Sequence, residues 1–132
     1  MEDFVSFEIA KKLKEKGFPQ RPDYFNYSSY YDWDGLRKIH SLCNASVWFD
    51  PNISRDNIYF APTISQVLKW LRKKKNIFVV TFIADDSDTP LTYEIYRGTE
   101  CLLTHHGKYF TLQEWDKCNL VGIEDVIDNN FI

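Results

Sequence analysis

Glycine and cysteine are both scarce in this sequence, and each shortage excludes a kind of functional site. The five glycines are all isolated, so they form neither a glycine-rich phosphate loop nor a Gly-x-Ser-x-Gly nucleophile turn. The three cysteines, Cys43, Cys101 and Cys118, are odd in number and irregularly spaced, which does not suit a disulfide framework. Their pattern favours reduced thiols in a reducing compartment.

Long apolar segments and an excess of basic residues are also missing. No stretch approaches the roughly eighteen apolar residues that span a membrane, and the charged start of the chain lacks the apolar run of a secretory signal. We therefore expect a cytoplasmic protein without membrane contact. The net charge of −3 argues against a nucleic-acid partner, because such binding normally needs a basic excess.

The residues that are present have the balance of an ordinary folded domain. The chain has 132 residues, of which 44% are hydrophobic and 27% are charged. That length is typical of one domain, and the hydrophobic content is enough to build a core. We predict a single domain over residues 1–132.

Three helices are indicated by residues that favour helix ends. Ser6 is a typical N-cap, and Gly17 suits the left-handed residue that follows a helix. Two later segments begin with a capping box, in which each side chain bonds to the free backbone N–H at the other position. The predicted helices cover about residues 7–16, 64–75 and 112–128, the last two opened by the pairs Thr63–Gln66 and Thr111–Glu114.

The other apolar segments favour antiparallel strands. Residues 77–84, IFVVTFIA, form a continuous run that predicts a strand buried on both faces near the middle of a sheet. Residues 91–97 alternate as an antiparallel partner would, and 101–104 can add a third strand. A ragged hairpin is predicted within 19–35, whereas 36–57 show no clear pattern. This order predicts an α+β fold, with an antiparallel sheet of about 4–5 strands packed against three helices.

Aromatic residues are the one component in excess. They make up 17% of the chain, and six of them fall within residues 24–33. A small core filled with large rings would explain the total, but one face of a hairpin cannot bury all six, since alternation sends some outward. We therefore predict a surface for a protein partner or for self-association, anchored by Tyr24, Tyr27, Tyr30, Tyr31 and Trp33.

A few residues could in principle form a reactive centre. Cys101, His105 and His106 are possible zinc ligands, with Cys118 and His40 further away along the chain. No Cys-x-x-Cys occurs, and a core thiol beside an exposed loop explains the same residues. We predict no catalytic residue, no metal and no cofactor, and keep as an alternative a small hydrolase-type enzyme in which the two loop histidines meet acidic groups.

Two charged runs each allow both a functional and a structural interpretation. Asp85, Asp86 and Asp88 follow the strongest strand and could hold Mg²⁺ or Ca²⁺, although a hairpin loop is a usual place for solvated aspartates. The basic run 72–75 could contact phosphate or an acidic protein, but its place at a helix end already suits the helix dipole.

Several segments together resemble a known family. FVSFEIAKKLKEKGF, then APTISQVLKWLRKKKNIFV, then a terminal helix beginning TLQEW resemble small uncharacterised proteins of gut Bacteroides-type bacteria and of their phages and prophages. The resemblance covers residues 4–18 and 60–80 well and the last helix loosely. It implies an accessory protein of a phage or another mobile element, and it supplies no catalytic residues.

We therefore expect a non-enzymatic, protein-binding accessory protein of phage or prophage origin. Inhibition of a host or defence protein is one way in which it could act. The hydrolase-type enzyme and a structural homo-oligomer are the alternatives.

Overall fold

The computed structural model describes residues 4–20, 29–32, 35–38 and 59–132. These residues belong to two compact units, one within Phe4–Thr63 and the other covering Ile64–Ile132. The described residues form three α-helices and six antiparallel strands, which are divided between two three-stranded sheets. The predicted α+β class with antiparallel strands and three helices is confirmed, although the strands do not join in one sheet. The expectation of a single domain stays a prediction.

Helix α1 (Phe7–Glu15) begins and ends where its flanking residues predict. The backbone N–H of Ile9 donates to Ser6 Oγ at 3.3 Å, and Gly17 follows the helix with a φ of 89°, a value that glycine adopts without strain. Ile9, Ala10 and Leu13 are buried along one face of the helix. This face gives the first unit its apolar core, because α1 lies against strand β3 (Tyr59–Ala61).

Strand β1 (Ser29–Asp32) is the centre of the first sheet, with β2 (Gly35–Lys38) and β3 on either side of it. The β1–β2 hairpin therefore lies further along the chain than the predicted one. The segment after α1 is tied to β3, because the Phe60 backbone N–H donates to the Gln20 side chain at 2.8 Å. Phe18 stacks on Phe60 with ring centroids 5.8 Å apart.

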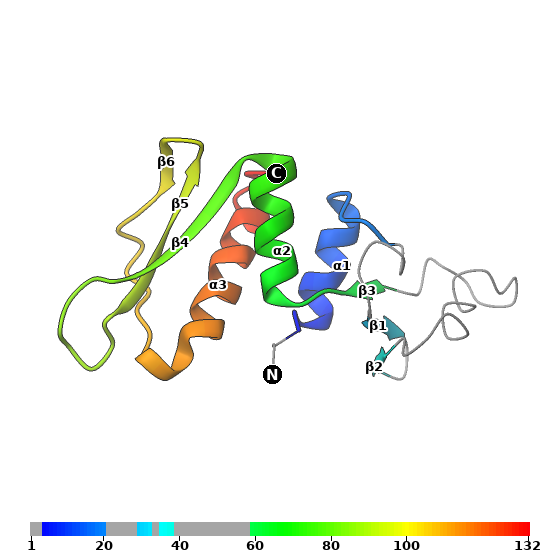
Figure 1. Ribbon diagram of the computed structural model, residues 1–132, viewed down its shortest axis with the longest axis horizontal. Helices are drawn as coiled ribbons and strands as arrows, with labels where there is room; N and C mark the ends of the chain where they lie inside the picture. Colours follow the sequence, from blue (N-terminus) through cyan, green and yellow to red (C-terminus); the bar gives the residue numbers. More distant parts are fainter. Residues whose placement is uncertain (1–3, 21–28, 33–34, 39–58) are drawn as a thin grey trace, which may run out of the picture. The chain divides into compact units, whose positions relative to one another are not determined.

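The second unit contains two helices and the second sheet (Figure 1). Helix α2 continues as a π-helical turn, and Asn76 then ends it in the left-handed conformation, with a φ of 56°. The capping box of Thr111 and Glu114 is formed at the start of the last helical segment. The elements are α2 (Ile64–Trp70), the turn Leu71–Lys75, β4 (Ile77–Ile83), β5 (Leu91–Arg97), β6 (Glu100–Leu103), a 3-10 turn (Leu112–Glu114) and α3 (Trp115–Asp128).

Strand β4 lies at an edge of the second sheet, so its predicted position near the middle of a sheet is wrong. Among the described strands the order is β4-β5-β6, and β4 pairs only with β5. Val80 and Ile83 keep 41% and 64% of their surface exposed. A continuous apolar run is typical of a strand covered on both faces, but here no described strand covers one edge of β4, and Val80 is exposed on the face away from α3.

Helix α3 packs directly on one face of β4 and β5. Gly122 faces the sheet closely, because a Cβ placed there would lie 2.5 Å from Val79 Cγ1 and 3.4 Å from the ring of Tyr93. The absence of a side chain at this position therefore sets how near the helix can come to the sheet.

We expect Gly122→Ala to lower the free energy of unfolding by about 1–3 kcal/mol, because the new methyl group overpacks the contact with Val79. The loss should appear although alanine favours a helix by about 1 kcal/mol over glycine. Urea denaturation of the purified protein measures it. Val79→Ala opens the same space, so the double variant should lose less stability than the two single variants summed. Strictly additive losses would contradict the proposed contact.

Candidate functional site

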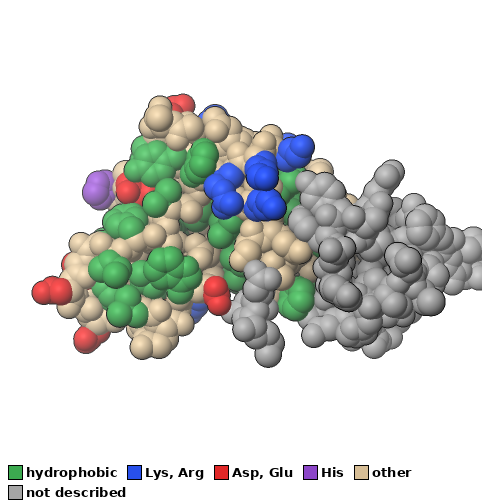
Figure 2. Space-filling model, in the orientation of Figure 1, with side chains coloured by type: hydrophobic (Ala, Val, Ile, Leu, Met, Phe, Trp, Pro, Cys, Tyr) green, Lys and Arg blue, Asp and Glu red, His purple; other side chains and the backbone are tan. Residues whose placement is uncertain are grey.

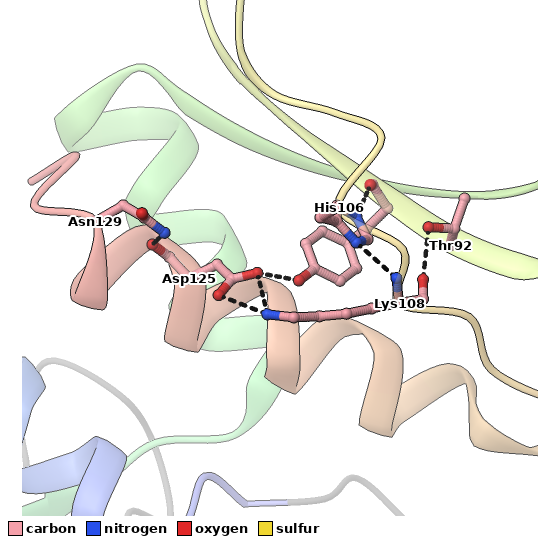
Figure 3. Close-up of polar contacts among 6 residues, drawn as sticks. Thr92, His106, Lys108, Asp125 and Asn129 are labelled. Atoms are coloured by element: carbon pink, nitrogen blue, oxygen red, sulfur yellow. Dashed lines mark hydrogen bonds and ion pairs between the residues drawn. The ribbon is translucent and has the colours of Figure 1, made fainter.

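A polar network joins β5, the segment after β6 and α3 in the second unit (Figure 3). The Tyr93 hydroxyl donates to Asp125 Oδ2, and Lys108 Nζ lies 3.0 Å from Asp125 Oδ1 and 2.9 Å from Oδ2. Tyr93 is fully buried, Asp125 is 9% exposed, and the Lys108 side chain is 44% exposed. The network therefore brings one carboxylate out of water and supplies it with a cation and a hydroxyl donor.

His106 contacts both the ring and the backbone of Tyr93. Its ring stacks on Tyr93 with centroids 4.1 Å apart. His106 Nε2 lies 2.7 Å from the Tyr93 carbonyl oxygen, and the Lys108 backbone N–H donates to His106 Nδ1 at 3.1 Å. Because Nδ1 accepts a hydrogen bond, the proton of the neutral ring lies on Nε2 and is donated to the carbonyl.

The network shows how each of its polar groups is used. Both nitrogens of His106 are engaged by the backbone, and both oxygens of Asp125 are engaged by Lys108 and Tyr93. Neither His105 nor His106 contacts a carboxylate within the described residues, so the acid–histidine pair of the enzyme alternative is not assembled there. The arrangement fits a role in holding α3 and the 104–110 segment on the sheet.

Burial raises the pKa of the Tyr93 hydroxyl far above its ordinary value of 10.0. The hydrogen bond to Asp125 and the negative charge of that carboxylate act in the same direction. The hydroxyl therefore keeps its proton in the folded protein and remains a donor to Asp125.

The candidate zinc ligands are not brought together. Cys101 is exposed on β6, whereas Cys118 is buried on α3, with its Sγ 3.8 Å from Thr81 Oγ1, and burial raises the pKa of its thiol. His105 is exposed, and His40 lies outside the described residues. In the part of the chain that the structure describes, no group of three or more His, Cys, Asp or Glu side chains is placed to hold a metal ion.

The two charged runs are exposed. Asp85 accepts hydrogen bonds from the Ser87 backbone N–H and hydroxyl, and these bonds lower the pKa of its carboxyl. The basic run stands together at the end of α2 (Figure 2), with Lys75 Nζ 5.4 Å from the centre of the Trp70 ring. Both runs therefore have the structural explanations that their positions in the sequence suggest.

The predicted aromatic anchors are only partly described. Tyr24, Tyr27 and Trp33 lie outside the described residues, and Tyr30 lies on β1. Tyr31 is half-buried, its hydroxyl donates to the Val5 carbonyl oxygen at 2.7 Å, and its ring meets Phe7 edge-on. The one anchor whose side chain is described therefore contributes to packing within the first unit.

A group of exposed apolar side chains at one end of the second sheet was not predicted. Ile83, Leu112 and Trp115 are 64%, 54% and 47% exposed, and we call these three residues the strand-end patch. Leu112 precedes Trp115 by three residues in the 3-10 turn, where side chains at that spacing lie above one another. In the sequence, Trp115 lies within the predicted helix 112–128, and no pattern there indicated that it would be exposed.

The packing of α3 on β4 places the parts of this patch toward the same end of the helix–sheet contact. Thr81 Oγ1 donates to Asn119 Oδ1 at 2.6 Å, which fixes the level of the helix on the strand. Ile83 lies two strand residues from Thr81, about 7 Å away on the same sheet face, and Trp115 lies four helix residues from Asn119, about 6 Å away on the same helix face. Gly122 lies beside Val79, so both displacements run toward the same end.

Comparisons with known proteins give no relative. No protein-family model, curated protein or solved structure matches the chain. Of the helices in the described ranges, none combines the length and the apolar character that a membrane crossing requires.

We expect Asp125→Ala to lower the free energy of unfolding by about 2–3 kcal/mol, because the buried Tyr93 hydroxyl loses its acceptor and Lys108 loses its counter-charge. Denaturation by urea measures the loss. Lys117→Ala is the matched control, since it removes an exposed ion pair with Glu114 and should change stability little. Equal effects of the two substitutions would show that the network contributes no more than a surface pair.

Alkaline pH should destabilise the protein through Tyr93. Above about pH 10 the tyrosine of the unfolded chain loses its proton, while folded Tyr93 keeps it. The unfolded state then binds fewer protons, so this contribution is fully present below that pH and falls above it by up to about 1.4 kcal/mol per pH unit. Tyr93→Phe should give a shallower decline of the free energy of unfolding, measured by urea denaturation, between about pH 8 and pH 11 than the unchanged protein does. Identical slopes for Tyr93→Phe and the unchanged protein would rule this out.

Proposed function

We propose that the protein is a non-enzymatic accessory protein that acts by binding a protein partner through the strand-end patch. The observation that carries the proposal is the exposure of three large apolar side chains at one end of the contact between α3 and the second sheet. Tryptophan is the residue most often found at the energetic centre of protein interfaces, and Trp115 is 47% exposed with Leu112 beside it. The helix holds both residues before any partner arrives, which lowers the entropy lost on binding.

The charge beside the patch indicates which kind of partner suits it. The loop that follows β4 carries Asp85, Asp86 and Asp88, all exposed. The hydrogen bonds from Ser87 favour the charged form of Asp85. A partner surface with an apolar side chain at its centre and Lys or Arg at its rim would complement both the patch and this loop.

The biological setting of the proposal comes from the sequence. The resemblance to phage and prophage proteins of gut Bacteroides-type bacteria supports an accessory role in which the partner is a host or defence protein, and in which binding inhibits it. The unpaired thiols of Cys101 and Cys118 suit action in the reducing cytoplasm. The predicted aromatic anchors are a second candidate contact. They rank below the strand-end patch because the Tyr31 hydroxyl is already bonded within the first unit.

The test uses one substitution in the patch and one matched control outside it. Trp115→Gln should weaken the binding of a partner captured from bacterial lysate at least about tenfold, since removal of a central aromatic side chain typically costs that much or more. Tyr109→Ser removes a side chain of nearly the same exposure, 49% against 47%, from a position outside the strand-end patch, and should leave the affinity unchanged. Titration calorimetry with the purified partner measures both.

One result of this experiment would contradict the proposal. If every partner that the unchanged protein enriches binds the Trp115→Gln variant as tightly, the patch is not the contact. Circular dichroism of both variants must match that of the unchanged protein, which excludes loss of folding as the cause of weaker binding.

A further inference from the structure

The two edges of the second sheet differ in how they are protected from pairing with another chain. Strand β6 has only four residues, begins with Glu100, and pairs with β5 through a register shift, a β-bulge or irregularity, between Ile95 and Tyr96. Short length, charge and a bulge are the usual devices that prevent a sheet edge from pairing with a second chain. The β6 edge therefore carries all three.

The β4 edge carries none of these devices. Its seven residues, IFVVTFI, contain no charge and no proline, and they pair in regular register with β5. Among the described residues no strand pairs with its other side. Hydrophobic side chains gather over the second sheet in Figure 2, and Val80, at the middle of β4, is 41% exposed. An open, uncharged edge of this length is a template for another strand.

The sequence of β4 is complementary to itself in an antiparallel pair. If two copies of β4 meet about a two-fold axis at Val80, Phe78 lies opposite Phe82 of the second copy, and Val79 lies opposite its Thr81. Aromatic pairs and pairs of β-branched residues are the favourable cross-strand neighbours in sheets. No like charges are brought together, because the strand has none. The same patch serves both copies, as a two-fold interface requires.

We propose that β4 joins a second copy of this chain, so that two three-stranded sheets become one continuous antiparallel sheet about a two-fold axis. The protected β6 edges then form both ends of the joined sheet, so assembly stops at two copies. The two proposals share Ile83, which belongs both to β4 and to the strand-end patch and would lie opposite Ile77 of the second copy. Their tests remain distinct, because Val80 lies outside the strand-end patch and Trp115 lies outside β4.

The test measures mass by analytical ultracentrifugation from about 1 µM to about 1 mM, the range in which small interfaces associate. The unchanged protein should approach twice its 15.7 kDa as the concentration rises. Val80→Lys and Val80→Glu should each raise the dissociation constant at least about tenfold, because like charges would lie directly opposite across the axis. An equal mixture of the two variants should associate again, because opposite charges then face each other.

Val80→Thr is the control, since it keeps a β-branched side chain without adding charge and should still form dimers. Circular dichroism checks that each variant is folded. Association of the two charged variants in the mixture shows independently that both are folded. The proposal is overturned if the unchanged protein stays monomeric throughout, if Val80→Lys still dimerises as tightly, or if the mixture of charged variants remains monomeric.

Discussion

The carboxylate of Asp125 is a charge that the second unit buries inside a helix–sheet contact. Lys108 and Tyr93 compensate for its removal from water, and they come from the segment after β6 and from β5. An uncompensated carboxylate there would oppose folding, so α3 is stable on the sheet only when both partners are in position. Gly122, one turn before Asp125, lets the helix approach the sheet closely enough for these short contacts.

This anchoring determines what remains exposed at the other end of α3. The helix is fixed at Asp125 and Asn119, and its first residue, Trp115, extends past the last bonded pair. Ile83 occupies the corresponding position on β4, beyond Thr81. The strand-end patch is therefore a consequence of where the polar contacts stop. Side chains further inside this interface, such as Ile123, are fully buried.

The sequence predicted local features well and the arrangement of strands poorly. Ser6, Gly17 and the Thr111–Glu114 box act on backbone groups within a few residues, so their effect could be predicted without knowing the fold. The edge position of β4 depends on which strands pair with it, and that information lies far away in the chain. The patch escaped prediction for the same reason, since only the packing of α3 places Ile83 and Trp115 toward the same end of the sheet.

Strand β4 has the apolar pattern of an interior strand although it lies at the edge of its sheet. The packing of α3 explains only part of this pattern. A sequence that had only to cover α3 would need apolar side chains on one face of β4 and could place charges on the other. Phe78, Val80 and Phe82 occupy that other face, where β5 has Glu94. Exposed apolar surface in a strand without charge favours association in water. The proposed pairing of β4 with a second copy would account for this composition, because it would cover apolar surface that the packing of α3 leaves on the other face.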